Sequence, residues 1–257
     1  MSMRLMFDNL ADYSATVITA GSEDAYLPVE NVQHPHRSKV YRTGTAAAAE
    51  WIKFDLGSAK AVQSVILLDH TLTGSDSLIK LQGNATDSWG APSVDETLTY
   101  NAGTLAKFLS AAQTYRWWRV IFTKSAAGET RDIGRIFLGP YYECVKNISF
   151  GGLKITPVDL SDTGRSIGGQ TYSDQRSLYH EIKTAFNYIL DAQMTQFKNI
   201  AAAVGTHTPL FISCDPTVKP YDWLYYVKFT KFTGETVEIY KSASPLWSVN
   251  LEFAEEL

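Results

Sequence analysis

The sequence predicts a mainly β protein, with an N-terminal β-sandwich of the jelly-roll type and a C-terminal α+β domain that combines antiparallel strands with one helix. Three observations favour this fold class. Aromatic residues make up 12% of the 257 residues, and flat rings pack well on pleated sheets. Short apolar stretches alternate with turn residues along the first half. A single strong helical pattern stands in the second half.

The first half contains a series of short strand patterns. Residues 51–56 alternate, so that Ile52, Phe54 and Leu56 share one face. Residues 62–68 are almost wholly apolar, as expected of a strand buried on both faces. Adjacent Trp117 and Trp118 must point to opposite faces of their strand. Further strands are predicted at residues 16–19, 78–82, 115–123 and 133–138, and loops at 29–45 and 83–93.

The pattern changes near Gly139-Pro140-Tyr141-Tyr142, which predicts two domains, 1–140 and 141–257. After this boundary, residues 147–156 indicate a hairpin around Gly151-Gly152, and residues 161–171 a glycine-rich exposed loop. Residues 178–188 fit a strand or a helix equally well.

One helix is predicted over residues 191–204 because its apolar residues recur at helical spacing. Asp191 is the expected N-cap and Gly205 the expected stop. The expected apolar stripe consists of Met194, Phe197, Ala201 and Val204.

The last strands are predicted to be antiparallel. Residues 223–230 and 236–240 would form a hairpin across Thr233-Gly234-Glu235. Residues 246–253 alternate and place Trp247, Val249, Leu251 and Phe253 on one face.

Composition excludes several function classes. The net charge of −4 lacks the basic surface that nucleic-acid binding needs, and no apolar run is long enough for membrane insertion. Asp8 and Asp12 lie where a signal peptide would need an apolar core, so synthesis and folding in the cytosol are expected. Cys144 and Cys214 match no zinc or disulfide pattern and are expected to be buried thiols.

No reactive cluster emerges from the sequence, so we expect no enzyme activity, no catalytic residue, no cofactor and no metal site. His34-Pro35-His36 lacks further ligands, and His70 fits the end of a buried strand. Asp159, Asp162 and Asp174 lack the spacing of a calcium loop. The segment GRSIGG at 164–169 lacks the lysine of a phosphate loop.

Four blocks in the first half carry a family resemblance. They are WIKFDLG at 51–57 followed by Val62 and Val65, LQGN at 81–84 followed by Trp89, YRWWRV at 115–120, and IGRIFLG at 133–139. Together they resemble discoidin-like domains, also called coagulation-factor type C or galactose-binding-like domains. The chain departs from that family by lacking a disulfide at its ends and a clear acidic calcium loop, since residues 31–37 are NVQHPHR.

The resemblance implies a ligand site in loops at one end of the sandwich. Aromatic rings there would stack on sugar faces and arginines would bind hydroxyl or carboxylate groups. The candidate contacts for a glycan or a protein partner are Arg37, Tyr41, Arg42 and Trp89.

The second half resembles tail-tip proteins of long-tailed bacteriophages, especially the distal tail class of the baseplate. The carrying segments are FISCDP at 211–216 and WSVNLEFAEE at 247–256. This resemblance implies a structural virion component, made in the bacterial cytoplasm, that forms a ring, usually a hexamer, between the tail tube and the hub. Trp223, Tyr225 and Tyr226 are the candidate ring interface.

Two alternatives stay open at this point. The chain could be another minor tail protein, or the sandwich could be a carbohydrate-binding module that attaches the virion to a glycan on the host surface.

Overall fold

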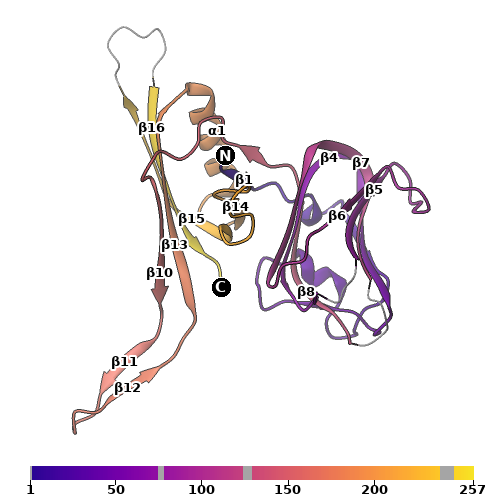
Figure 1. The fold of residues 1–257 in the computed structure, drawn as a ribbon, viewed down its shortest axis with the longest axis horizontal. Coiled ribbons are helices and arrows are strands. Elements are labelled where there is room, and N and C mark those ends of the chain that lie inside the picture. The colour runs from indigo at the N-terminus through magenta and orange to yellow at the C-terminus, as the bar shows by residue number, and fades with distance from the viewer. Residues whose placement is uncertain (1, 75–77, 124–128, 238–245) are drawn as a thin grey trace. The chain divides into compact units, whose positions relative to one another are not determined.

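The computed structural model describes residues 2–74, 78–123, 129–237 and 246–257. The chain divides into two compact units, Asp8–Tyr142 and Met1–Phe7 with Glu143–Leu257. Both units consist mainly of antiparallel strands, and the described residues contain one α-helix (Figure 1), which confirms the predicted fold class. Sequence analysis placed the first seven residues in the sandwich, whereas the structure places them in the second unit.

The Asp8–Tyr142 unit is a β-sandwich made from one seven-stranded sheet that folds over on itself. Its strand order is β3-β8-β4-β7-β5-β6, and β2 pairs with β4. The strands are β2 (Val17–Ala20), β3 (Tyr41–Arg42), β4 (Ala49–His70), β5 (Leu78–Asn84), β6 (Val94–Thr97), β7 (Thr104–Thr123) and β8 (Asp132–Gly139). Two short 3-10 helices, η1 (Leu10–Asp12) and η2 (Val29–Gln33), complete the unit.

The two long strands β4 and β7 fold the sheet. The first part of β4 pairs with β2 and its last part pairs with β8, while β7 follows it throughout. Figure 1 shows β4 and β7 bending over together at one end of the unit. Gly57 has φ 72° at the bend, and the register slips there between Asp55 and Lys60. The two separate strands predicted at 51–56 and 62–68 are therefore one strand with a bulged corner.

The core of the sandwich collects the inward residues of these strands. Ile52, Phe54 and Leu56 are buried as predicted, and Trp118 is fully buried whereas Trp117 lies on the outer face. Trp118 packs against Gly83, where an added Cβ would lie only 2.8 Å from the indole ring. Strand β5 can lie this close to the tryptophan only because residue 83 has no side chain.

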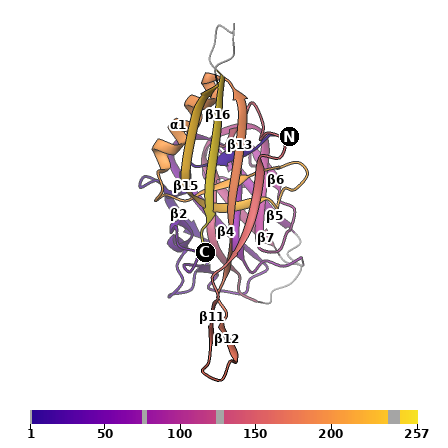
Figure 2. The same ribbon diagram turned by 90° about the vertical axis from the view of Figure 1, so that its left-hand side faces the viewer.

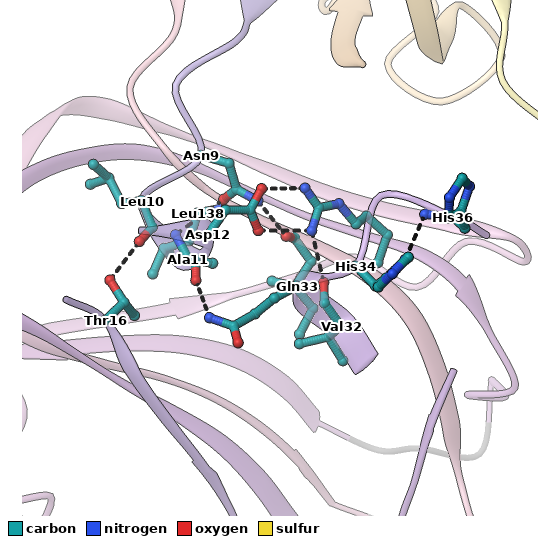
Figure 3. Close-up of polar contacts among 12 residues, drawn as sticks. Asn9, Leu10, Ala11, Asp12, Thr16, Val32, Gln33, His34, His36 and Leu138 are labelled. Carbon is teal, nitrogen blue, oxygen red and sulfur yellow. Dashed lines mark hydrogen bonds and ion pairs between the residues drawn. The ribbon is translucent and has the colours of Figure 1, made fainter. Parts of the chain in front are cut away.

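A polar network ties β8 to the two 3-10 helices (Figure 3). Arg135 is buried, and its Nη1 donates to Asp12 Oδ1 at 2.8 Å and to the carbonyl of Val32 at 3.1 Å. Asn9 accepts from the Leu138 amide and donates to the carbonyl of Ile136, each at 2.9 Å. Part of the loop predicted at 29–45 is thus ordered as η2 and β3.

The second unit is built on a seven-stranded sheet with the order β10-β13-β16-β15-β14-β1-β9. Figure 2 shows β15, β16 and β13 side by side, with the small β11–β12 sheet extending beyond one end of them. The strands are β1 (Arg4–Met6), β9 (Tyr142–Glu143), β10 (Leu153–Asp159), β11 (Asp162–Arg165), β12 (Thr171–Asp174), β13 (Leu178–Ile189), β14 (Leu210–Ser213), β15 (Leu224–Val237) and β16 (Leu246–Glu255).

The helix α1 (Asp191–Val204) covers one face of this sheet and has the predicted bounds. Its buried side chains are Gln193, Met194, Phe197, Ile200 and Val204. Ile200 thus takes the place that sequence analysis gave to Ala201. Asp191 is the first helical residue rather than the N-cap, which is Leu190 without a capping side chain. The helix stops at Gly205 as predicted, with φ 56°.

Three further expectations for the second half need correction. Strand β15 continues through residues 233–235, with a bulge between Phe229 and Lys231, so the predicted hairpin there is wrong. Residues 238–240 of its predicted second arm lie outside the described residues. Residues 161–171 belong largely to the β11–β12 hairpin, and only the second arm of the hairpin predicted at 147–156 is a strand. The ambiguous stretch 178–188 is strand β13.

The alternation predicted for the last strand is confirmed for Val249, Leu251 and Phe253, which are all buried in β16. Cys144 and Cys214 are free, buried thiols, as expected.

Candidate functional site: an aromatic hollow on the outer face of the sandwich

Alternation along β4 and β7 brings aromatic and basic side chains together on the outer face of the sandwich. Trp51 and Lys53 point outward from β4 because Ile52 and Phe54 point into the core. Arg119 pairs with Lys53 across the two strands, and Trp117 lies two residues from Arg119 on the same face. The Lys53 ammonium lies 5.4 Å from the ring centroids of both Trp51 and Trp117.

The loop between β5 and β6 folds onto this face through two side chains. Asp87 forms an ion pair with Lys53 at 2.7 Å and accepts a hydrogen bond from Trp89 Nε1, also at 2.7 Å. The guanidinium carbon of Arg119 lies 4.5 Å from the centroid of the Trp89 ring, which is a close cation–π contact. These contacts fix the loop over the sheet.

Five side chains enclose a hollow of about 150 Å³: Trp51, Lys53, Asp87, Trp89 and Arg119. Pockets for drug-sized ligands commonly measure roughly 300–1,000 Å³, so this hollow suits a much smaller group. The walls combine two indole rings with two cations and one carboxylate.

Hydrogen bonds beneath the hollow hold Arg119 in place. Its Nε donates to Gln82 Oε1 at 2.6 Å, and Gln82 in turn donates to Asp95 at 2.9 Å. Within the described ranges, neither Nη atom of Arg119 has a hydrogen-bond partner. The guanidinium therefore has donors available for a bound molecule.

Asp87 and Arg119 are both ionised at neutral pH. The hydrogen bond from Lys53 lowers the pKa of Asp87 below its usual value, so the carboxylate is charged. Burial lowers the pKa of Arg119, yet an arginine starts so high that the guanidinium stays protonated. The hollow can thus both accept and donate charge-assisted hydrogen bonds.

The structure does not bring the four predicted ligand contacts together. Only Trp89 lies at the hollow. Arg37 forms a two-bond ion pair with Asp69, and Arg42 forms one with Asp132, all at 2.7 Å. Tyr41 is fully buried and its hydroxyl donates to the carbonyl of Ser22 at 2.6 Å, so its predicted role as a contact is wrong.

Four residues of the hollow were not among the predicted contacts, namely Trp51, Lys53, Asp87 and Arg119. The alternation that places Ile52 and Phe54 inward already placed Trp51 and Lys53 outward. The missing information was the pairing of β4 with β7, which carries Arg119, and the fold of the loop that carries Asp87.

The predicted ring-interface residues also need correction. Tyr226 is buried, with its ring 4.7 Å from that of Phe211, and is not available to a partner. Trp223 and Tyr225 are half-buried, and Tyr225 lies against His180 with 5.5 Å between ring centroids. Strand β15 pairs with β14 over Leu224–Val227 and with β16 from Val227 to Val237.

The histidines considered in the sequence lie in two different settings: His70 is buried, whereas the His34-Pro35-His36 segment is exposed. His34 and His36 lie in an exposed loop with their rings 5.0 Å apart. Across the described ranges, no three His, Cys, Asp or Glu residues gather in a way that could hold a metal ion. None of the described helices has the length and apolar character needed to span a membrane.

No protein-family model matches the chain, and no curated protein matches it. Several solved structures are similar to part of the chain. CpGH89CBM32-6 produced by Clostridium perfringens is 18% identical, with a TM-score of 0.42, over 53% of this chain and 99% of its own. The family 32 carbohydrate-binding module of C. perfringens NanJ, solved in complex with galactose, is 13% identical with a TM-score of 0.42, over 54% and 99%. A fucose-binding module of Streptococcus pneumoniae is 13% identical with a TM-score of 0.42, over 51% and 94%. At these values the likeness assigns no ligand to this chain.

Proposed function

We propose that the sandwich unit binds a carbohydrate, with one sugar ring held in the hollow on its outer face. The observation that carries this proposal is the lining of the hollow, where Trp51 and Trp89 stand beside Lys53, Asp87 and Arg119. The C–H faces of a sugar ring stack on indole rings, and its hydroxyl groups bind to charged donors and acceptors. The polar groups are already fixed by the loop contacts, so little ordering is needed on binding.

The direct test is a glycan array, followed by calorimetry with the best ligand. Trp51→Ala removes a stacking wall and is expected to weaken binding at least tenfold, which corresponds to about 1.4 kcal/mol. Trp89→Ala is expected to weaken it further because the loop also loses its hold on Arg119. Arg42→Ala is the matched control, since Arg42 is paired with Asp132 away from the hollow, and should leave the affinity unchanged.

A silent array would overturn the proposal. So would a ligand whose affinity depends on Arg42 and is indifferent to Trp51, because that result would place the site among the loops at the end of the sandwich.

A second candidate function is structural, as a ring-forming component of a phage or prophage tail tip. It is supported by the sequence resemblance of the second half and by the β11–β12 hairpin, a separate two-stranded sheet with little buried surface. The two functions are compatible, because a virion part can carry a glycan-binding module. Light scattering with negative-stain imaging tests the ring: a closed assembly with a central hole supports it, and a monomer at every concentration contradicts it.

A further inference from the structure

The second unit exposes two apolar surfaces at opposite ends of β13. One is the hairpin formed by β11, β12 and their flanking residues, here named the arm, where Leu160, Ile167, Tyr172 and Leu178 are exposed. The other, here named the groove, is a hollow of about 390 Å³ lined by Val145, Lys146, Tyr188, Leu190, Ala192 and Gln193. Contiguous exposed apolar surface commonly marks an interaction site.

The arm has almost no core of its own. Its two strands form a separate sheet in which all four residues of β12 and three of the four in β11 are exposed. Tyr172 packs over Gly164 across the hairpin and is still 64% exposed, and Ile167 at the turn is completely exposed. Because an isolated two-stranded hairpin is at best marginally stable in water, the arm needs a surface to pack against.

The groove is shaped by an unusual backbone conformation. The ladder between β13 and β16 slips between Phe186 and Ile189, and Tyr188 inside this bulge has φ 58°. Lys146 holds the turned residue, since its Nζ donates to the carbonyl of Tyr188 at 3.0 Å and lies 5.5 Å from the ring centroid. Val145, Tyr188 and Leu190 are left 82%, 52% and 57% exposed around the hollow.

The arm of a chain cannot reach its own groove. Strand β13 has 12 residues and joins the two surfaces, so they lie roughly 36–40 Å apart at about 3.3 Å per residue. Figures 1 and 2 show the arm pointing away from the end of the sheet where α1 begins. Every copy carries an arm, so the arm of a second copy can reach a groove that the chain's own arm cannot.

We propose that the arm of one copy docks in the groove of the next, with Ile167 inserted between Val145 and Leu190. The contact is heterologous, so repetition produces a ring if the rotation closes. This inference deepens the second candidate function by giving the ring its interface.

Sedimentation velocity of the full chain over a wide concentration range tests the contact with two surface variants. Ile167→Asp and Leu190→Asp each place a charge in the interface and are expected to leave monomers. Mixing the two variants is the decisive measurement, because one retains an intact groove and the other an intact arm. The mixture should form a one-to-one complex that grows no further. Val17→Asp, an exposed apolar position of the sandwich, is the control and should assemble like the wild type.

The outcomes separate this inference from the function on which it rests. If the wild type assembles and both variants still assemble, the arm–groove contact is refuted while a ring through another surface stands. If the wild type stays monomeric, and Ile167→Cys mixed with Leu190→Cys gives no disulfide-linked dimer, the contact and the ring both fail.

Discussion

At the residue scale, the absence of a side chain at Gly83 sets the packing of the sandwich core. Its backbone lies directly against the Trp118 ring, the largest fully buried side chain of the described residues. No feature of the sequence LQGN predicts this contact, because it depends on the long-range pairing of Gly83 with Trp118 between β5 and β7.

Gly83→Ala should therefore destabilise the sandwich. The new methyl group would overlap an indole that is enclosed on all sides, and such overpacking costs about 1–3 kcal/mol. Urea unfolding followed by tryptophan fluorescence measures the change. Gly90→Ala is the matched control, since nothing lies within 4 Å of its added Cβ, and equal stability losses for both variants would contradict the packing argument.

The two cysteines make a prediction about alkaline pH. Burial raises the pKa of Cys214 to about 12 and also raises that of Cys144. The native state thus keeps both thiol protons when the unfolded chain, with a pKa of about 8.5, has lost them. Their contribution to stability is complete below that value and is lost as the pH rises, at about 1.4 kcal/mol per pH unit and thiol.

Unfolding free energies measured between neutral and strongly alkaline pH should fall in the wild type. They should fall less steeply when Cys144 and Cys214 are both replaced by Ala. Identical slopes would show that the thiols ionise as easily in the folded chain as in the unfolded one.

At the element scale, sequence patterns predicted elements whose signals are local. The bounds of α1 follow from its apolar spacing and from Gly205, and the inward face of β16 follows from simple alternation. Local patterns did not predict that residues 51–56 and 62–68 belong to one continuous strand, β4. The small residues after Gly57 suggest a turn, yet β4 and β7 stay paired across that corner because the register slip absorbs the bend.

The residues of the hollow also divide into those that a local pattern predicts and those that depend on long-range contacts. Alternation indicates that Trp51 and Lys53 face outward, but Arg119 and Asp87 join them only through strand pairing and the fold of a loop. Arg42 and Arg37 looked equally suitable from the sequence because their carboxylate partners, Asp132 and Asp69, are distant along the chain.

Strand β1 gives an element-scale prediction. Its Leu5 is fully buried and pairs with Ile212 of β14. Leu5→Ala should lower the stability of the second unit by about 2–5 kcal/mol through the lost contacts and the cavity left behind. Differential scanning calorimetry should show this as a shift of one transition, with the glycan affinity of the sandwich unchanged. A shift of the sandwich transition would contradict the assignment of β1 to the second unit.

At the scale of the whole molecule, the sandwich is an insertion within the second unit. Strands β1 and β9 are neighbours in one sheet, and the sandwich residues 8–141 lie in the connection between them. This arrangement could not be predicted from the sequence, because Arg4–Met6 form a strand too short to give a recognisable pattern. Their partner strand β14 also lies about 200 residues away along the chain.

Because the sandwich is an insertion, each unit is expected to fold without the other. A chain in which residues 8–141 are replaced by a short turn should keep a cooperative unfolding transition, since β1 and β9 would then form a simple hairpin. The excised fragment 8–142 should bind the same glycan with the affinity of the full chain. Circular dichroism and calorimetry check both, and a fragment that folds without binding would show that the hollow needs residues outside it.

The pairing of β1 with β14 also has a consequence for synthesis on the ribosome. Met3, Leu5 and Met6 are buried, but residues 211–213, which pair with Arg4–Met6, leave the exit tunnel about 200 residues after them. At roughly 5–20 residues per second, this apolar segment waits on the order of 10–40 s for its partner while the sandwich completes itself. A nascent chain stalled before β14 should therefore expose Met3, Leu5 and Met6 to chaperones and proteases. This exposure ends when β14 pairs with β1 and completes the sheet of the second unit.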